Sequence, residues 1–498
     1  MTRYLCVHGH FYQPPRENPW TGDIGVEASA APYRNWNERI TEECYRPNAH
    51  PVSRSPDGTP REMPSNYSRM SFNFGPTLFE WLDRRAPDVG QEIRRADRES
   101  RDRFSGHGSA IAQGYNHVIL PLANARDRRT QVLWGIRDFE HRFGRSPEGM
   151  WLPETAVDTA TFEALASFGI RFTILAPQQA RRVRSLEGGD WRDVSGAQID
   201  PRRPYAVNLP SGARIAVFFY DGPTSGAIAF GALAEGGEAL ARRLAGLAAD
   251  TPQPQLLHVA TDGETYGHHH HHGEVVLAEA LDLLPASGFA RLTNYGEFLS
   301  LHPPEYEVEV VEDTAWSCTH GLGRWKEDCG CRTGLHPGWT QDWRAPLRES
   351  LDALRDALSP VFEEYGSRFF EDPWAARDAS IAIFLDSSPE ALAEFLRRVG
   401  RASTAGSGAA EARALLDMQR HAMLMYTSCG WFFDDPSGLE TTQIIRYAAR
   451  AIELCPEPRR GSIEADFLGR LEAVRSNDPE VGNARRIFEA NAGPLRVT

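Results

Sequence analysis

Short apolar segments alternate with helical segments through the first three hundred residues of the chain. Apolar runs of this length, bounded by polar or turn residues, are typical of buried strands. The repeated order of strand and then helix indicates a parallel sheet, either open or closed into a barrel. We predict strands at residues 4–8, 149–152, 171–175, 214–219, 256–260 and 290–293, and helices at 74–85, 130–143, 158–168, 236–249 and 274–284.

Polar side chains gather where these predicted strands end. His8, His10, Glu154, Asp221 and Asp262 lie at, or directly after, the carboxyl end of a strand. In a β/α barrel the catalytic groups collect at that edge, and open α/β sheets bind ligands at the same end of their strands. The pattern therefore locates a candidate site, although it does not decide the topology.

The character of the sequence changes after about residue 305. Residues 306–313 alternate like a strand, and residues 316–343 are rich in Gly, Cys and Trp. Helical patterns follow at 347–365, 374–385, 389–398, 409–425 and 439–454, with Ser388 as the cap of one helix and residues 403–408 as a linker. We therefore predict an α/β domain over residues 1–305, a connecting segment over 306–345 and a mainly α-helical C-terminal domain over 346–498.

Asp262 follows a predicted buried strand and precedes Gly263, which allows a tight turn. A single aspartate in this place often closes a turn or caps the next helix. Here Glu264, Tyr266 and His268 follow within six residues, and this cluster favours a functional site.

Glu154 ends another predicted strand, beside Trp151. The glutamate could instead start a helix, where the dipole favours an acid, and the tryptophan could belong to the core. As a pair, Glu154 and Asp262 supply what glycoside hydrolysis requires, which is one carboxylate to attack the anomeric carbon and one acid to protonate the leaving oxygen. Their separation would distinguish a retaining pair, at roughly 5–5.5 Å, from an inverting pair, at roughly 6.5–9.5 Å.

Histidines occur in two of these segments. His8 and His10 could ligate a metal or donate hydrogen bonds to sugar hydroxyls, and Gln13 can both donate and accept. Five consecutive histidines at 268–272 cannot all point inward. A metal-dependent hydrolase, such as a polysaccharide deacetylase using His8, His10, Asp262 and one histidine of the run, is therefore an alternative. A non-catalytic glucan-binding protein is another.

Four segments together, in this order, resemble motifs of glycoside hydrolase family 57. They are residues 8–15, 113–121, 151–154 and 261–267, and the resemblance covers about residues 4–300. It implies an incomplete (β/α)7 barrel, a retaining mechanism without metal or cofactor, and α-glucan substrates. The implied activities are those of an α-amylase, a 4-α-glucanotransferase or a branching enzyme. It also implies Glu154 as nucleophile and Asp262 as acid/base, and it places His10, His117, Trp151 and His268 where the family binds the reacting sugar.

The second half of the chain carries a further resemblance. Residues 427–435 are similar to a Ser-Asp-Trp segment with which the helical domain of the family reaches the active site, but Cys429 and Gly430 stand where a single Asp is usual. Tyr220 and Asp221 stand where branching members have Arg-Asp, which disfavours branching activity. The whole chain resembles a subgroup with a C-terminal domain of unassigned function (DUF3536-like). The remaining substrate-binding predictions are His8, Gln13, Asp221, Glu264, Trp325 and Trp431.

Cys318, His320, Cys329 and Cys331 form a possible set of four ligands. Thiolate and imidazole ligands suit a closed structural Zn²⁺ site, although this spacing is not one of the common zinc patterns. Alternatively the cysteines act as small apolar residues in an irregular buried segment. The tryptophans nearby, among them Trp316 and Trp325, could stack on sugars or form the core that joins the two domains.

The composition narrows the choice of partners. A net charge of −14 without a long basic run argues against nucleic acid or an anionic membrane surface, and it is compatible with a neutral oligo- or polysaccharide. No segment approaches the roughly 18 apolar residues of a membrane span, and the N-terminus lacks the pattern of a secretion signal. Seven cysteines, an odd number, fit a reducing compartment. We predict a cytoplasmic protein and leave its oligomeric state open.

Overall fold

The computed structural model describes residues 2–55, 57–334, 336–401 and 408–493. The chain divides into two compact units that interleave along the sequence. The first, which we call the barrel unit, comprises Met1–Gln13, Val26–Gly114 and Phe139–Trp316. The second, the helical unit, comprises Pro14–Gly25, Tyr115–Asp138 and Ser317–Thr498. The domain boundaries at residues 305 and 346 stay a prediction.

The strands are short, and most of them belong to the barrel unit. They are β1 (Arg3–Phe11), β2 (Val52–Arg54), β3 (Pro60–Glu62), β4 (Ser71–Phe74), β5 (Ala112–Gln113), β6 (Met150–Trp151), β7 (Phe172–Leu175), β8 (Ala180–Ser185), β9 (Arg192–Asp193), β10 (Tyr205–Asn208), β11 (Arg214–Phe219), β12 (Gln255–Asp262), β13 (Arg291–Leu292) and β14 (Tyr306–Val310).

The α-helices occur throughout the chain, and the C-terminal half consists mainly of them. They are α1 (Trp36–Ile40), α2 (Arg46–Ala49), α3 (Pro76–Arg85), α4 (Pro87–Arg103), α5 (Ala125–Phe143), α6 (Thr159–Ser167), α7 (Gly222–Ala229), α8 (Gly237–Ala245), α9 (Gly273–Ala286), α10 (Tyr295–Leu301), α11 (Arg344–Gly366), α12 (Pro373–Ala379), α13 (Ile381–Leu385), α14 (Pro389–Val399), α15 (Ala409–Leu424), α16 (Leu439–Glu453), α17 (Arg459–Leu471) and α18 (Ala484–Asn491).

Parallel pairing links seven strands in the order β12-β1-β4-β5-β6-β7-β11. Two of the steps are single bridges, Phe72 to Ala110 and Gly149 to Phe172. Between β11 and β12 a backbone hydrogen bond runs from Asp221 N to His258 O, at 3.1 Å. This order and direction confirm the predicted α/β class and the incomplete (β/α)7 barrel.

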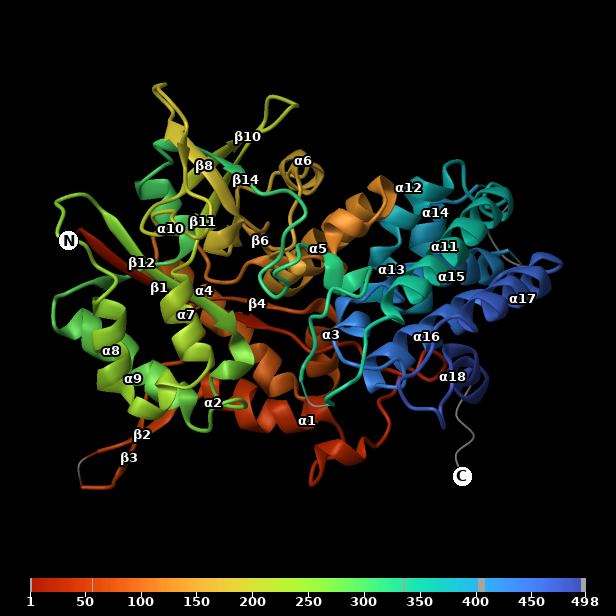
Figure 1. Cartoon of the computed structure of the whole chain (residues 1–498), viewed down its shortest axis with the longest axis horizontal. Helices are drawn as coiled ribbons and strands as arrows, with labels where there is room; N and C mark the ends of the chain where they lie inside the picture. The colour runs from red at the N-terminus through yellow and green to blue at the C-terminus, as the bar shows by residue number, and fades with distance from the viewer. Residues whose placement is uncertain (1, 56, 335, 402–407, 494–498) are drawn as a thin grey trace. The chain divides into compact units, whose positions relative to one another are not determined.

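β1 is the central strand of this arrangement, and almost every residue in it is buried. It pairs with β12 along its whole length, from Arg3 beside Gln255 to His10 beside Asp262, and the two strands run together in Figure 1. On its other side, the carboxyl half of β1 pairs with β4. The register therefore brings His10, Asp262 and the polar residues of β4 to one edge of the sheet.

A second group of strands, β10, β14, β8 and β9, extends the sheet beyond β11. After β14 the chain returns to the barrel edge, where Thr314 bridges to Val157 in antiparallel direction. Trp316 follows two residues later. The return places Trp316 close to Glu154, because Val157 lies three residues after Glu154.

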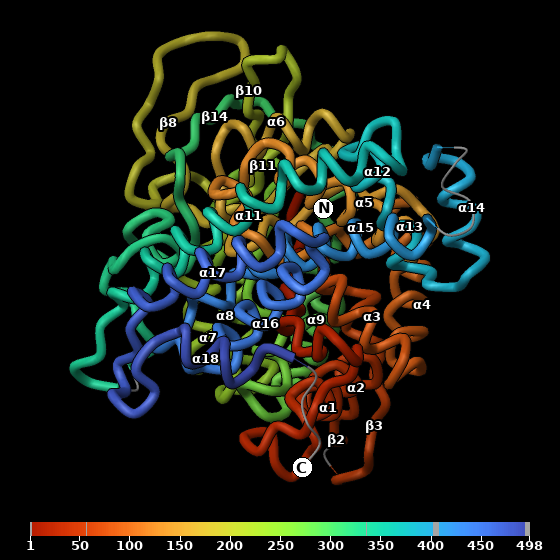
Figure 2. The backbone as a smooth tube through the Cα atoms, turned by 90° about the vertical axis from the view of Figure 1, so that its right-hand side faces the viewer, coloured from red at the N-terminus to blue at the C-terminus, as the bar shows by residue number. Residues whose placement is uncertain are grey.

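In the helical unit, α16 contacts both α15 and α18, and α11 contacts α15 and α17. Figures 1 and 2 both show α16, α17 and α18 side by side. The predicted mainly helical character of this half is confirmed. Ser388 caps α14 as expected, with its Oγ accepting from Ala391 N at 3.2 Å. Of the predicted linker 403–408, residues 403–407 lie outside the described part of the chain.

Two element predictions need correction, beyond shifts of up to five residues at the ends of other helices. The helix expected from residue 74 begins at Pro76, because Phe74 ends β4, a strand that the sequence did not indicate. Proline at the first helical position is favoured there, since its missing N–H has no helical partner in any case. The helix expected over 374–385 is two helices, α12 and α13, that meet at Ser380. Within the described residues, no helix is long and apolar enough to cross a lipid bilayer.

Candidate active site

Glu154 lies in a strained turn directly after β6. Its backbone is left-handed, with φ 58° and ψ 18°, and Thr155 follows with φ 50°. A left-handed conformation costs a residue with a Cβ about 1–2 kcal/mol. Such strain persists only where the surroundings enforce it, and it concentrates at functional sites. The Glu154 side chain is only 9% exposed.

Trp316 holds Glu154 from two sides. Its indole Nε1–H donates to Glu154 Oε2 at 3.0 Å, and its backbone N–H donates to Glu154 O, also at 3.0 Å. Trp316 also packs edge-on against Trp151, with ring centroids 5.1 Å apart. The sequence suggested only sugar stacking or a core position for Trp316, since 162 residues separate it from Glu154.

Asp262 is the last residue of β12, at the same edge of the sheet. A Cβ on the following Gly263 would lie 2.3 Å from Phe11 Cδ1, so only glycine fits at the turn. Asp262 is exposed to solvent as a residue, although protein atoms surround its carboxyl closely. Burial, and secondly the charge of Glu154, raise its pKa from 3.8 to about 7. Near neutral pH Asp262 can therefore hold a proton beside a charged carboxylate.

Tyr220 completes the surroundings of Asp262. Its side chain is buried, and burial together with the charge of Asp262 raises its pKa above the ordinary value. Its ring meets Trp316 edge-on, with centroids 6.4 Å apart. The next residue, Asp221, caps α7, because its side chain accepts from Thr224 N at 2.8 Å. Asp221 was a predicted substrate-binding residue, and the structure gives it this capping contact.

A buried polar network supports the two histidines of β1. Asn73, on β4, places Oδ1 3.2 Å from His8 Nε2 and Nδ2 2.9 Å from His10 Nδ1, and Nδ2 also donates to Gln113 Oε1 at 2.8 Å. Ser71 Oγ lies 3.0 Å from His8 Nδ1. Neither Asn73 nor Ser71 was predicted from the sequence, because the strand that carries them has only four residues.

The contacts of Asn73 assign the tautomers of both histidines. Its carbonyl oxygen must accept from His8, so His8 carries its hydrogen on Nε2 and accepts from Ser71 on Nδ1. Its amide N–H must donate to His10 Nδ1, so His10 carries its hydrogen on Nε2. Burial lowers the pKa of each ring to about 3, and both rings are therefore neutral at physiological pH.

Glu264 is buried and connects three segments. Its Oε1 accepts from Tyr12 N at 3.0 Å and from the Tyr45 hydroxyl at 2.6 Å. Burial is the main cause that raises its pKa to about 8. Through its hydrogen bond with Tyr12 N, the buried Glu264 thus links the end of β1 to the turn that follows Asp262.

Trp151 and Gln13 are also largely enclosed. Trp151 has no exposed surface, and its ring stacks on His8 and His10 with centroids 4.9 and 5.0 Å apart. Gln13 donates from Nε2 to Tyr12 O at 3.0 Å. In this structure Trp151 is therefore enclosed by protein side chains, and it supports the two histidines.

The histidine run follows Glu264 at the edge of the barrel. His268 Nδ1 lies 2.5 Å from Glu43 Oε2, and His270 Nε2 donates to Ala229 O at 3.0 Å. Among the described residues, His8, His10, Asp262 and this run do not form a group that could hold a metal ion. Both ring nitrogens of His8 contact Ser71 and Asn73, and Nδ1 of His10 contacts Asn73.

Three predicted substrate-binding residues, His117, Trp325 and Trp431, belong to the helical unit. His117 is buried with a left-handed backbone, φ 55°, and its Nδ1 lies 2.6 Å from Ser428 Oγ. Trp325 and Trp431 have no exposed surface. Within that unit Val118 forms a β-bridge with Thr427, so residues from two segments that were singled out separately from the sequence lie side by side.

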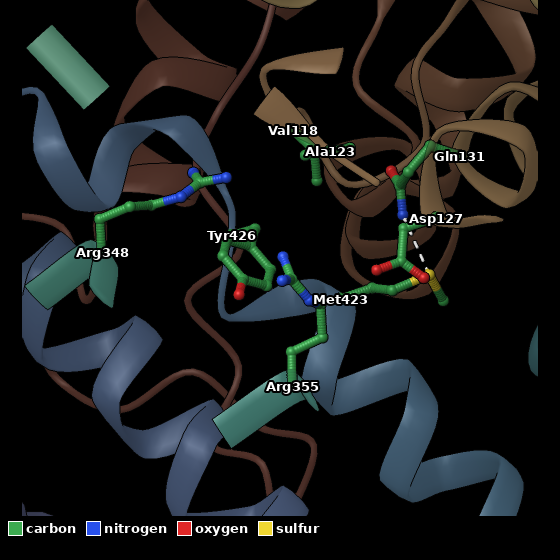
Figure 3. A pocket seen from close by; sticks show the side chains of 8 residues that line it. All are labelled: Val118, Ala123, Asp127, Gln131, Arg348, Arg355, Met423 and Tyr426. Carbon is green, nitrogen blue, oxygen red and sulfur yellow. Dashed lines mark hydrogen bonds between the residues drawn. The ribbon is translucent and has the colours of Figure 1, made fainter. Parts of the chain in front are cut away.

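The Cys429-Gly430 departure has a packing explanation. A Cβ on Gly430 would lie 2.4 Å from Ile444 Cδ1 on α16, so the backbone there must approach the helix closely. Figure 3 shows a pocket beside the bridge between Val118 and Thr427. Its charged side chains are paired, Asp127 with Arg377 at 2.6 Å and Arg355 with Asp352 at 2.9 Å. It is lined by Val118, Ala123, Asp127, Gln131, Arg348, Arg355, Met423 and Tyr426.

Comparison with known proteins gives two family matches. The model of "Glycosyl hydrolase family 57" matches residues 4–311, and that of "Domain of unknown function (DUF3536)" matches residues 339–498. Alpha-amylase 1 of Dictyoglomus thermophilum is 23% identical over 138 residues. That match spans 28% of this chain and 18% of the relative.

Solved structures share the fold at low sequence identity. The exo-type maltose-forming amylase of Pyrococcus sp. ST04 has a TM-score of 0.73 at 15% identity, over 99% of this chain and 91% of that chain. The GH57-type branching enzyme of Pyrococcus horikoshii has a TM-score of 0.54 at 16% identity, over 94% and 95%. The 4-alpha-glucanotransferase of Thermococcus litoralis has a TM-score of 0.53 at 16% identity, over 91% and 60%.

The family model covers well over half of the sequence, and all four motif segments lie within the matched region. The seven-stranded parallel order agrees with the fold that the resemblance implied. This chain therefore belongs to glycosyl hydrolase family 57.

Proposed function

We propose that this protein cleaves or transfers α-glucan chains by a retaining double displacement, with Glu154 as nucleophile and Asp262 as general acid/base. One observation carries the proposal. Glu154 and Asp262 lie at the same edge of the sheet, and burial together with the nearby Glu154 raises the pKa of Asp262 to about 7, so that Asp262 can donate a proton near neutral pH. Two carboxyl groups in different protonation states are what the first step of this mechanism needs.

In that step a Glu154 oxygen attacks the anomeric carbon while the bond to the leaving oxygen breaks. Asp262 gives its proton to that oxygen and becomes a carboxylate. In the second step Asp262 takes a proton from water or from a glucan hydroxyl, whose oxygen attacks the anomeric carbon and displaces Glu154.

His10 is the histidine that we place nearest to the reacting sugar. It pairs in register with Asp262, and its ring hydrogen is on Nε2. A neutral imidazole with this tautomer can donate to a sugar hydroxyl without carrying a charge into the site. Gln13, His117 and His268 remain proposed substrate contacts from the family motifs.

Support for an α-glucan comes from the family and from the related proteins, which are an amylase, a branching enzyme and a glucanotransferase. Tyr220 stands beside Asp262 where branching members carry Arg, so we favour hydrolysis or linear transfer over branching.

Product analysis with maltooligosaccharides and amylose tests this proposal directly. Shorter products indicate hydrolysis, a ladder of longer and shorter chains indicates disproportionation, and new branch points indicate branching. Glu154→Gln should lower turnover by at least about a thousandfold without unfolding the protein, since the change is nearly isosteric. The matched control is Glu187→Gln, at an exposed turn of the same unit, which should keep full activity.

Asp262→Asn separates the roles of the two acids. Glucosyl substrates with a good leaving group need no proton from the enzyme, so we expect this variant to form the covalent intermediate from them much faster than from maltooligosaccharides. Full activity of Glu154→Gln on amylose would refute the assignment of the nucleophile. An equal loss on both substrate types in Asp262→Asn would refute the assignment of the acid.

A further inference from the structure

Three thiols and one imidazole converge in the irregular segment that precedes α11. The ligand atoms of Cys318, His320, Cys329 and Cys331 all lie within 4.8 Å of one another. All four residues belong to the helical unit. Among the described residues, this is the one group that could hold a metal ion. We propose that these four residues form a closed, structural Zn²⁺ site.

The distances match the geometry of such a site. With Zn–S bonds of about 2.3 Å and a Zn–N bond of about 2.05 Å, tetrahedral ligands lie about 3.8 Å apart for S···S and about 3.6 Å apart for S···N. Cys318 Sγ lies 3.9 Å from both Cys329 Sγ and Cys331 Sγ, and Cys331 Sγ lies 3.5 Å from His320 Nδ1. Disulfides need a separation near 2.05 Å, so these thiols are gathered without being bonded.

The backbone is built to bring the thiols together. Gly330, between Cys329 and Cys331, has φ +79°, a left-handed conformation that glycine adopts without strain. On the other side of the cluster, a Cβ on Gly323 would lie 2.8 Å from Cys329 Cβ. A side chain at position 323 would therefore push against Cys329, and one at position 330 would strain the turn that joins Cys329 to Cys331.

The surrounding charges favour an anionic centre. Three thiolates and one neutral imidazole around Zn²⁺ carry a net charge of −1. Arg344 is fully buried and donates from Nη1 to Cys331 O at 2.8 Å. Arg324 is also buried and donates from Nη2 to Ser317 O at 3.2 Å. Asp434 supplies one negative charge near Arg344, and a negative metal centre beside both guanidinium groups would further offset the cost of burying two cations.

The site would order a segment with little regular structure of its own. Between Cys318 and Cys331 the chain forms only one short 3-10 turn, Gly323–Trp325. That turn carries Trp325, which has no exposed surface. Binding energy from a structural zinc is folding energy, so the ion would hold this loop and its buried tryptophan in place. The inference is independent of the catalytic assignment.

Metal analysis of the purified full-length chain tests the site. We expect about one zinc per chain after dialysis without chelator. Cobalt exchanged into the wild-type protein should give two kinds of absorption band. They are the thiolate-to-metal charge-transfer bands and the strong visible d–d bands of a tetrahedral centre. Cys331→Ser should lower the zinc content at least roughly tenfold. Cys455→Ser, in the same unit but outside the cluster, should keep it. A chelator should lower the unfolding temperature of the wild type and leave that of Cys331→Ser unchanged.

Three results would overturn the proposal. They are wild-type protein that holds less than about one tenth of a zinc per chain after incubation with Zn²⁺, unchanged zinc content in Cys331→Ser, and a Cys329–Cys331 disulfide detected by mass spectrometry in the purified protein. If Cys331→Ser fails to fold, the cobalt spectrum of the wild type decides, because a band intensity of three thiolates per metal needs three gathered cysteines, and among the described residues only Cys318, Cys329 and Cys331 are so placed.

Discussion

Glu154→Gln removes the negative charge beside Asp262 and keeps the size of the side chain, so it isolates the electrostatic coupling of the two acids. In the wild type the pKa of Asp262 is raised from 3.8 to about 7, first by burial and then by Glu154. Because burial is the larger cause and persists in the variant, the pKa of Asp262 should fall but stay above the midpoint of these two values, roughly 5.4. Solvent access to Asp262 screens the charge and makes the change smaller still.

Carbon-13 NMR of protein labelled at the aspartate carboxyl carbons measures this pKa directly. The resonance of Asp262 is identified by its absence from the spectrum of Asp262→Asn. Titration between about pH 3 and pH 9 then gives the pKa in the wild type, in Glu154→Gln and in the control Glu187→Gln, which should behave as the wild type. A wild-type value near 3.8 would refute Asp262 as an acid at neutral pH. An unchanged value in Glu154→Gln would show that the two carboxyl groups do not share one site.

The sign of the pH dependence follows from the same value. Asp262 can protonate the leaving oxygen below about pH 7, so activity on maltooligosaccharides should fall as the pH rises through 7. For stability, the folded state binds this proton more tightly than the unfolded state between about pH 4 and 7. The contribution of Asp262 to the free energy of unfolding therefore decreases as the pH rises through that window, and it is constant above it.

Two further variants test the support around the pair. Trp316→Phe removes the indole donor to Glu154 Oε2, and the loss of a hydrogen bond to a charged group, about 1.5–3 kcal/mol, should lower kcat/KM by roughly 10- to 150-fold. Trp191→Phe, at a half-buried tryptophan of the same unit, is its control. Equal activity of both variants would contradict a role for the Trp316 hydrogen bond in positioning Glu154. Asn73→Asp replaces the donor to His10 and Gln113 with an acceptor, so urea denaturation should show a loss of about 2–5 kcal/mol in the free energy of unfolding. The exposed Asn208→Asp should show almost none, and an Asn73→Asp protein as stable as the wild type would disprove the tautomer assignment.

The sequence predicts Asp262 because it ends β12, a strand of eight residues, and it predicts Glu154 because the short apolar run at 149–152 leads into it. It does not predict the order of the barrel, since β5 and β6 have two residues each and show no periodicity. The Asn73 network escapes prediction for a related reason. Its members come from three strands, and hydrogen bonds between strands leave no local pattern.

The orientation of Glu154 shows why the rest could not be predicted. Local preference would let Glu154 and Thr155 begin an ordinary helix, yet both adopt left-handed backbone angles. Gln179, which is fully buried, enforces this conformation, because its Nε2 donates to Thr155 O at 2.8 Å while its Oε1 accepts from Thr155 Oγ1 at 2.9 Å and from Ala176 N at 2.9 Å. Trp316 adds its backbone hydrogen bond to Glu154 O. The partners that offset the strain thus come from segments 25 and 162 residues away from Glu154, as the chain positions of Gln179 and Trp316 show. Strain of this kind persists only where tertiary contacts enforce it. The sequence can therefore predict where the carboxylate lies along the chain, but its orientation depends on contacts that form only in the folded barrel.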